Sequence, residues 1–185
     1  MRSTNIICIL FISLLLASSI CCVAEDSADK VAASLAVPKE NLPEGFNLLA
    51  ALPEMDSSVN MTDYIKHFYG EKEIGPANVS VGIYLWGTQG QSYDAKVTFI
   101  QLSDEDHAKA AISNFKSTYN KLIARGLHIF DNVTINDHDA LQIKDVMGDN
   151  SIRYLYLWNR ESLVTLVEGN GDQNKSMQLA SATRL

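Results

Sequence analysis

The stretch from residue 127 to residue 168 decides the fold and reads LHIFDNVTINDHDALQIKDVMGDNSIRYLYLWNRESLVTLVE. Four of its segments are rich in β-branched, aromatic and aliphatic side chains, which favour extended backbone. Short polar sequences of the kind found in turns separate them. The four segments are Leu127–Ile135, Ala140–Val146, Ser151–Trp158 and Ser162–Glu168. Their close spacing predicts an antiparallel meander of four strands.

A second hairpin and the longest helix are predicted before this meander. Side chains alternate in character over Asn78–Trp86, and after a glycine-containing turn Tyr93–Leu102 returns as the partner strand. Ser103 is the expected N-cap of the helix, acidic residues fill its first turn, and Gly126 ends it. Apolar side chains recur along it at helical spacing, at Ala108, Ala111, Ile112, Phe115, Tyr119, Leu122 and Ile123.

Three further elements complete the pattern. Gly45–Leu52 predicts a first strand, Thr62–Tyr69 a short helix and Asp172–Thr183 a closing helix. The resulting order along the chain is β-α-β-β-α-β-β-β-β-α. This order predicts an α+β fold, in which an antiparallel β-sheet has helices packed mainly on one face.

The front of the chain predicts export. Arg2 is the only charged residue before Glu25, and the apolar run Ile6–Ala17 lies between them. A basic start, an apolar run and small residues before the cut are typical of a secretory signal peptide. We therefore expect residues 1–24 to be a signal peptide cut after Ala24, residues 25–45 a tether, and residues 46–185 a single α+β domain. The protein is expected outside the cytoplasm, either extracellular or in the cell envelope.

Two alternatives for the front of the chain stay open. Ser3–Ala24 carries no charge and is long enough to span a bilayer, which takes about 20 apolar residues, so it could remain as an anchor. Cys21 or Cys22 could instead carry a lipid, although no small residue precedes Cys21. In both cases the membrane is reached only through this N-terminal segment.

Composition excludes several function classes. The chain has 185 residues and a formal net charge of −7, and loss of residues 1–24 with Arg2 would make the charge −8. Such an acidic protein is not expected to bind nucleic acid or an anionic membrane surface, since both attract Lys and Arg clusters. All three cysteines lie in the predicted signal peptide, so the exported domain must be held together by its apolar core.

Four Asn-x-Ser/Thr triplets occur in the region predicted to be exported. Such triplets are acceptors for N-glycosylation when they lie on the surface of an exported protein. The asparagines are Asn60, Asn78, Asn132 and Asn174.

No catalytic, metal-binding or cofactor motif stands out. The chain has no Gly-x-Ser-x-Gly nucleophile motif and no His pair at ligand spacing, and its glycine pairs lack the spacing of phosphate loops. Asp137-His138-Asp139 is the cluster that most resembles a ligand set, since His and carboxylates bind metal ions. It also lies where a polar turn is expected, and the turn is the favoured interpretation. We therefore expect no cofactor and no metal.

Aromatic side chains point to a different kind of site. They alternate with aliphatic residues in two predicted strands, at Tyr84 and Trp86 and at Tyr154, Tyr156 and Trp158. If the strands share a sheet, one face could carry an aromatic patch that binds a sugar, an apolar ligand or a partner protein. Helices covering this face would instead make the five rings part of the core.

The segment RYLYLWNRESLVTLVEGN at residues 153–170, followed by a short helix rich in Leu and Ala, resembles small uncharacterised exported proteins of methanogenic archaea. That resemblance implies no activity and adds no site residue. The layout is also similar to the Mog1/PsbP-like α+β sandwich, and this fold analogy implies at most a binding role.

Three functions are compatible with these features. The leading hypothesis is a non-catalytic binding module, exported or in the cell envelope, whose ligand or envelope partner meets the sheet. One alternative is an exported hydrolase, with His138 beside Asp137 or Asp139 as its candidate site. The other is a purely structural envelope protein, with neither a pocket nor a patch.

Overall fold

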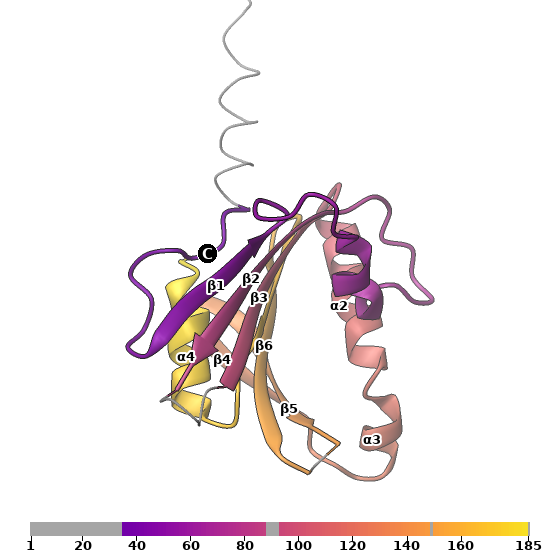
Figure 1. The fold of residues 1–185 in the computed structure, drawn as a ribbon. Helices are drawn as coiled ribbons and strands as arrows, with labels where there is room; N and C mark the ends of the chain where they lie inside the picture. The colour runs from indigo at the N-terminus through magenta and orange to yellow at the C-terminus, as the bar shows by residue number, and fades with distance from the viewer. Residues whose placement is uncertain (1–34, 88–92, 149, 185) are drawn as a thin grey trace, which may run out of the picture. The chain divides into compact units, whose positions relative to one another are not determined.

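Strands with alternating side chains build one antiparallel sheet in the computed structural model, which describes residues 35–87, 93–148 and 150–184. The predicted α+β fold is confirmed, since helices pack against this seven-stranded sheet (Figure 1). The elements are β1 (Phe46–Leu52), η1 (Met61–Phe68), β2 (Asn78–Trp86), β3 (Tyr93–Gln101), α2 (Glu105–Ser117), α3 (Asn120–Ala124), β4 (Phe130–Ile135), β5 (His138–Val146), β6 (Ile152–Arg160), β7 (Leu163–Glu168) and α4 (Gln173–Ala182).

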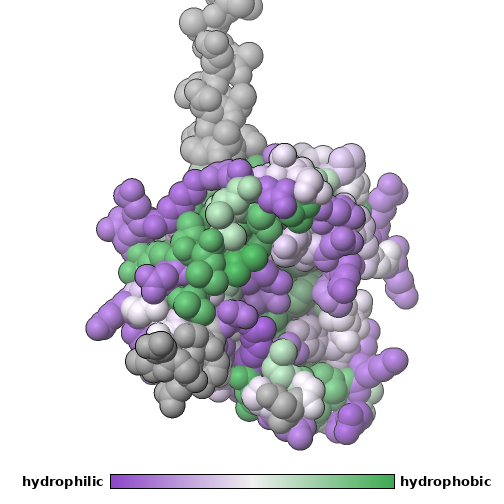
Figure 2. All heavy atoms as spheres, in the orientation of Figure 1, coloured by the Kyte–Doolittle hydropathy of each residue, from purple (hydrophilic) through white to green (hydrophobic). Residues whose placement is uncertain are grey.

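The predicted meander forms and joins the first hairpin through its last strand. The strand order is β1-β2-β3-β7-β6-β5-β4, and every neighbouring pair is antiparallel. β7 therefore lies at the centre of the sheet, while β1 and β4 are its edges. Figure 2 shows apolar residues gathered over β1 and β2 on the side facing the viewer, and β1 carries the half-exposed Leu49.

The predicted long helix is two helices in the structure. α2 ends at Ser117 and α3 begins at Asn120. Two hydroxyls compete for backbone carbonyls at the break, since Ser117 Oγ donates to the oxygen of Asn114 at 2.6 Å and Thr118 Oγ1 donates to that of Phe115 at 2.7 Å. Asp104, rather than Ser103, is the N-cap of α2, because its carboxylate accepts the backbone N–H of His107.

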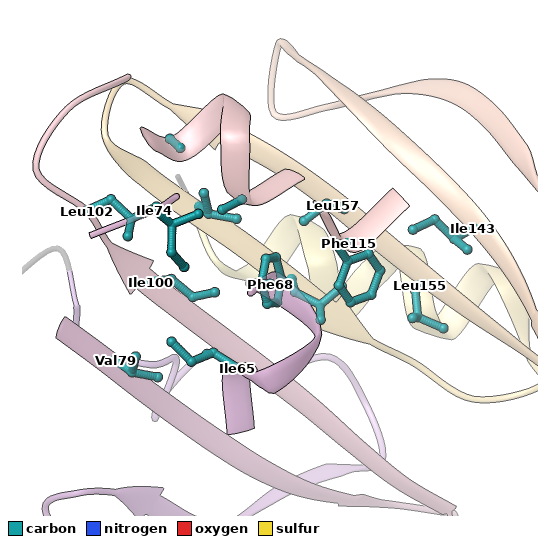
Figure 3. Close-up of a cluster of buried hydrophobic side chains, with 14 of the residues drawn as sticks. Ile65, Phe68, Ile74, Val79, Ile100, Leu102, Phe115, Ile143, Leu155 and Leu157 are labelled. Atoms are coloured by element: carbon teal, nitrogen blue, oxygen red, sulfur yellow. The ribbon is translucent and has the colours of Figure 1, made fainter. Parts of the chain in front are cut away.

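Side-chain alternation divides the core into two clusters, one on each face of the sheet. On the first face η1 and α2 cover aliphatic residues of the strands, and Phe68 and Phe115 meet between them at a ring-centroid distance of 4.8 Å (Figure 3). On the second face α4 covers the sheet together with the segment before β1, where Leu35 and Val37 are buried. Leu35 and Val37 of the predicted tether therefore belong to the core of the folded domain.

A buried amide fixes the chain after η1 to α2. Asn114 Nδ2 donates to the oxygen of Phe68 at 3.0 Å and to that of Lys72 at 2.7 Å, and its Oδ1 accepts the N–H of Lys72 at 3.1 Å. The side chain is 4% exposed. Leaving a buried polar group without a partner costs free energy of folding. The side chain of Asn114 therefore holds the loop after η1, whose backbone groups at Phe68 and Lys72 it satisfies.

Replacing Asn114 by Ala should lower the free energy of unfolding by about 2–3 kcal/mol, because it leaves buried backbone groups without partners. Urea unfolding followed by circular dichroism measures the change. Asn120→Ala makes the same substitution at an exposed position of α3 and should stay within about 0.5 kcal/mol of the wild type. Equal effects of the two substitutions would contradict the role assigned to Asn114.

Candidate functional site: a notch between two hairpins

A notch forms in the sheet because its central strand is shorter than its neighbours. β7 ends at Glu168, which pairs with Lys96 of β3 and with Leu155 of β6. β3 begins three residues before Lys96, and β6 begins three residues before Leu155. The β2–β3 and β5–β6 hairpins therefore project past the end of β7, at the lower end of the sheet in Figure 1. The notch between them has a volume of about 1170 Å³.

The walls of the notch carry both aromatic and polar side chains. Trp86 and Asp94 line it from the first hairpin, and Arg153 and Tyr154 from the second. Met147 and the exposed Ile152 add apolar surface toward the tip of the second hairpin. The loop from Asn170 to Asp172, which connects β7 to α4, forms its base.

Arg153 ties the two walls together. Its Nε donates to the backbone oxygen of Gly169 at 3.0 Å, and its Nη2 donates to the backbone oxygen of Asp94 at 2.8 Å. The guanidinium thus crosses from β6 to β3 where β7 no longer separates them. Two of its donors are used within the protein, so Arg153 mainly sets the width of the notch.

The base of the notch holds an amide with an unused donor. Asn170 Oδ1 accepts the N–H of Asp172 at 2.8 Å, and the backbone oxygen of Asn170 accepts the N–H of Tyr154 at 3.1 Å. Asn170 is only 3% exposed, yet its Nδ2 has no hydrogen-bond partner among the described residues. A buried unpaired donor is rare in folded proteins. Thr98 Oγ1 and Trp158 Nε1 in the core also lack a partner among the described residues, so this feature by itself does not indicate a ligand.

Gly169 brings α4 close to the end of β7. A Cβ at this position would lie 2.1 Å from Ser176 Oγ and 2.7 Å from the backbone oxygen of Tyr154. Ser176 Oγ in turn accepts the N–H of Asn170 at 2.9 Å. Only glycine fits here, and the contact fixes the loop that forms the base of the notch.

The predicted aromatic face is only partly exposed. Tyr84 and Tyr156 are fully buried and Trp158 is 2% exposed, so a continuous exposed patch of all five rings is wrong. The rings do share one face, but α4 and the segment with Leu35 and Val37 cover it. The remaining two, Trp86 and Tyr154, are partly buried at the rim of this cluster, and both line the notch.

The covered tyrosines have specific structural partners. Tyr84 donates from its hydroxyl to the backbone oxygen of Pro38 at 2.8 Å and so anchors the segment before β1. Tyr156 donates to the backbone oxygen of Gln173 at 3.2 Å and accepts from Gln142 at 3.0 Å. Burial raises the pKa of Tyr84, of Tyr156 and, on the other face, of Tyr119 above the ordinary tyrosine range.

The cluster at Asp137-His138-Asp139 lies at a hairpin turn: Asp137 is in the turn, and His138 and Asp139 begin β5. Asn136 and Asp137 are the two central residues of the β4–β5 hairpin, and both have positive φ, at 48° and 66°. Asn and Asp tolerate this conformation well, and it is typical of a two-residue hairpin turn. In the part of the chain that the structure describes, no three His, Cys, Asp or Glu side chains gather closely enough to hold a metal ion.

A second group resembles a catalytic triad in composition but not in geometry. Ser103 Oγ lies 2.9 Å and Asp104 Oδ1 2.7 Å from the same atom, Nδ1 of His107. A triad needs the serine and the carboxylate on opposite ring nitrogens, so that His can take the proton of the serine. Asp104 is instead the N-cap of α2, with Ser103 just before it and His107 in the first turn of the helix.

The predicted glycosylation sites all have exposed asparagines. Asn78 begins β2, and Asn132 lies on the edge strand β4. Asn174 lies in the first turn of α4, and the Oδ1 of Asn60 caps η1 by accepting the N–H of Thr62. Exposure at all four positions is compatible with modification.

The predicted signal peptide, its cut after Ala24 and the candidate anchor Ser3–Ala24 lie outside the described residues. Within residues 35–87, 93–148 and 150–184, no helix is long and apolar enough to cross a membrane. Compared with protein-family models, with curated proteins and with solved structures, the chain matches none of them.

The stability of the protein should fall in alkaline solution because of the buried tyrosines. The fold favours the neutral phenol, whereas unfolded tyrosines ionise near pH 10. Their contribution is therefore complete below about pH 10 and is lost as the pH rises above it, by up to about 1.4 kcal/mol per pH unit for each group. Urea midpoints measured from pH 8 to pH 11.5 should show this decline.

Tyr84→Phe removes one of these groups and should make the alkaline decline shallower, although it also loses the bond to Pro38. Tyr69→Phe, at an exposed position, is the matched control and should leave the pH dependence as it is. A Tyr84→Phe curve parallel to that of the wild type would contradict the assignment.

Proposed function

We propose that the protein is an exported, non-catalytic binding module of the cell envelope or extracellular space, and that its ligand binds in the notch between the β2–β3 and β5–β6 hairpins. The observation that carries this proposal is the notch itself, about 1170 Å³ in volume, whose lining combines the rings of Trp86 and Tyr154 with the exposed carboxylates of Asp94 and Asp172. Ligand sites commonly combine apolar walls with a few convergent polar groups, and the notch has both.

The geometry favours binding over catalysis. Asp137 lies in a hairpin turn and His138 begins the strand after it, and the serine and carboxylate near His107 meet the same ring nitrogen. Arg153 is engaged by two backbone carbonyls. The named candidates for an exported hydrolase therefore lack the arrangement that nucleophile activation requires. A purely structural role predicts neither a pocket nor a patch, whereas the notch is a pocket with aromatic and polar lining.

Blocking the notch tests this proposal. Gly148 lines the notch, and a Cβ there would meet no atom within 4 Å, so Gly148→Trp adds a large ring without displacing the core. We expect at least one member of a ligand panel to shift the NMR signals of Tyr154 and Asn170 in the wild type and not in Gly148→Trp. The panel contains neutral oligosaccharides, polyamines, inorganic phosphate, short peptides and medium-chain fatty acids.

Arg160→Trp is the matched control for the blocked notch. Arg160 is exposed at the opposite end of β6, so the same ring is added away from the notch, and binding should stay as in the wild type. The proposal is abandoned if no compound in the panel perturbs the notch, or if the blocked variant binds as well as Arg160→Trp does.

Export and glycosylation form a second part of the proposal. A signal peptide cut after Ala24 gives a chain that begins at Glu25, and exposed Asn60, Asn78, Asn132 and Asn174 are then available to the glycosylation machinery. The resemblance of residues 153–170 to exported archaeal proteins supports the same localisation.

Intact-mass spectrometry of the protein from its native host should give the mass of residues 25–185, with additional mass at one or more sequons. Asn132→Gln, on the edge strand, should remove one glycan mass if that site is used, and Asn136→Gln, outside any sequon, should remove none. A mass that retains residues 1–24 would point to an anchor, and an added acyl mass on Cys21 or Cys22 to a lipoprotein.

A further inference from the structure

We propose that the notch binds a neutral carbohydrate of about two or three sugar units, an inference that rests on the proposed function and names its ligand class. The aromatic side chains, the polar groups and the distribution of charge in the notch each support this class over the alternatives.

The aromatic groups supply flat surfaces in fixed positions. Trp86 stacks on Phe46 at a centroid distance of 5.8 Å and an interplanar angle of 26°, so its ring is held from one side. Tyr154 is anchored by its backbone, which pairs with Gly169 and Asn170. Both rings are partly exposed at the notch. Sugar rings carry apolar C–H faces, and Tyr and Trp offer large apolar surfaces beside a polar tip.

The polar groups suit hydroxyls, which both donate and accept. Asp94 and Asp172 bring exposed carboxylates that can only accept. Asp172 is held in place because its Oδ1 caps α4 by accepting the N–H of Lys175 at 2.9 Å. Fixed acceptors of this kind match a ligand with several hydroxyls on adjacent carbons, because each hydroxyl can donate to them.

Charge and size argue against other ligand classes. The charged residues that line the notch are two carboxylates, Asp94 and Asp172, and one guanidinium, Arg153, so negative charge predominates and an anion is disfavoured. Polar groups on both walls and at the base disfavour a fatty chain. A volume of about 1170 Å³ exceeds the range of about 300–1,000 Å³ typical of small-ligand pockets. An oligosaccharide would use this space more fully than a single sugar.

Calorimetry tests the inference with maltotriose, cellotriose, chitotriose and mannotriose as probes. At least one should bind the wild type. Tyr154→Ala should weaken that affinity about tenfold or more through loss of the ring, whereas Tyr154→Phe keeps the ring and should stay within about threefold. Asp94→Asn should weaken it about tenfold, because a charged acceptor becomes a neutral one. Melting curves of each variant verify that it is folded.

Two further arms separate the possible outcomes. Retention on the matching insoluble polysaccharide distinguishes a ligand that is part of a wall or polymer from a free oligosaccharide. Spermidine, inorganic phosphate and a tripeptide serve as competing classes. If one of these binds in a way that Gly148→Trp abolishes while no trisaccharide does, the notch is a site but the carbohydrate inference is overturned. If no probe of any class binds, the proposed function fails with it.

A sugar that binds equally well to the wild type, Tyr154→Ala and Gly148→Trp would also overturn the inference, since it would then occupy another surface. Support requires that the affinity for the same trisaccharide falls in Tyr154→Ala, Asp94→Asn and Gly148→Trp and persists in Tyr154→Phe and Arg160→Trp.

Discussion

The close contact between Gly169 and α4 is the constraint on which the functional end of the molecule depends. A side chain at residue 169 would collide with Ser176 and with the backbone of Tyr154, so the chain can leave the sheet here only as glycine. Because β7 ends at Glu168, its two neighbours continue without a strand between them. The same contact places Asn170 below the gap and directs α4 onto the second face of the sheet. One steric requirement thus sets the notch, its base and the helix that covers the aromatic rings.

The layers on either side of the sheet are explained by its central strand, β7, which is covered on both faces. Residues Leu163 to Val167 are all buried, although alternation points them to opposite faces. η1 and α2 cover one face, and α4 with the segment around Leu35 and Val37 covers the other. The hydroxyl of Tyr84 holds that segment in place through Pro38. The aromatic face of the sheet is therefore mostly part of the core. Only Trp86 and Tyr154, at the edge of this cluster, reach solvent in the notch.

The proposed binding role rests on which polar groups are already used. Arg153 joins Asp94 to Gly169 through backbone carbonyls, and Asp172 caps α4. These bonds hold the walls and base in place before any ligand arrives, and such preorganisation lowers the entropic cost of binding. By contrast, the groups near His107 are satisfied by one another at a helix end. The combination of aromatic rings and exposed carboxylates around an open notch, rather than the abundance of titratable groups, marks the notch as the candidate site.

Much of the fold was predictable from local pattern. Alternation identified the strands, and short polar turns joined the last four into a meander. The two-residue period of a strand also placed Tyr84 and Trp86 on the same face of one strand, and Tyr156 and Trp158 on the same face of another. The break between α2 and α3 was not predicted, because the competing hydroxyls of Ser117 and Thr118 act on backbone carbonyls that a periodic apolar pattern does not reveal. Among the site residues, sequence reasoning selected Trp86 and Tyr154 but missed Asp94, Arg153 and Asn170.

The sequence by itself therefore determined most of the elements, the antiparallel pairing within the β2–β3 hairpin and the β4–β7 meander, and the division of side chains between two faces, since each depends on neighbours close in the chain. Only the tertiary structure decided which aromatic rings are covered and where a ligand could enter. Those outcomes depend on contacts between residues far apart in the chain, namely Tyr84 with Pro38, Arg153 with Asp94, and Gly169 with Ser176 at the turn into α4. Periodicity places a side chain on a face, but burial is set by what the folded chain lays over that face.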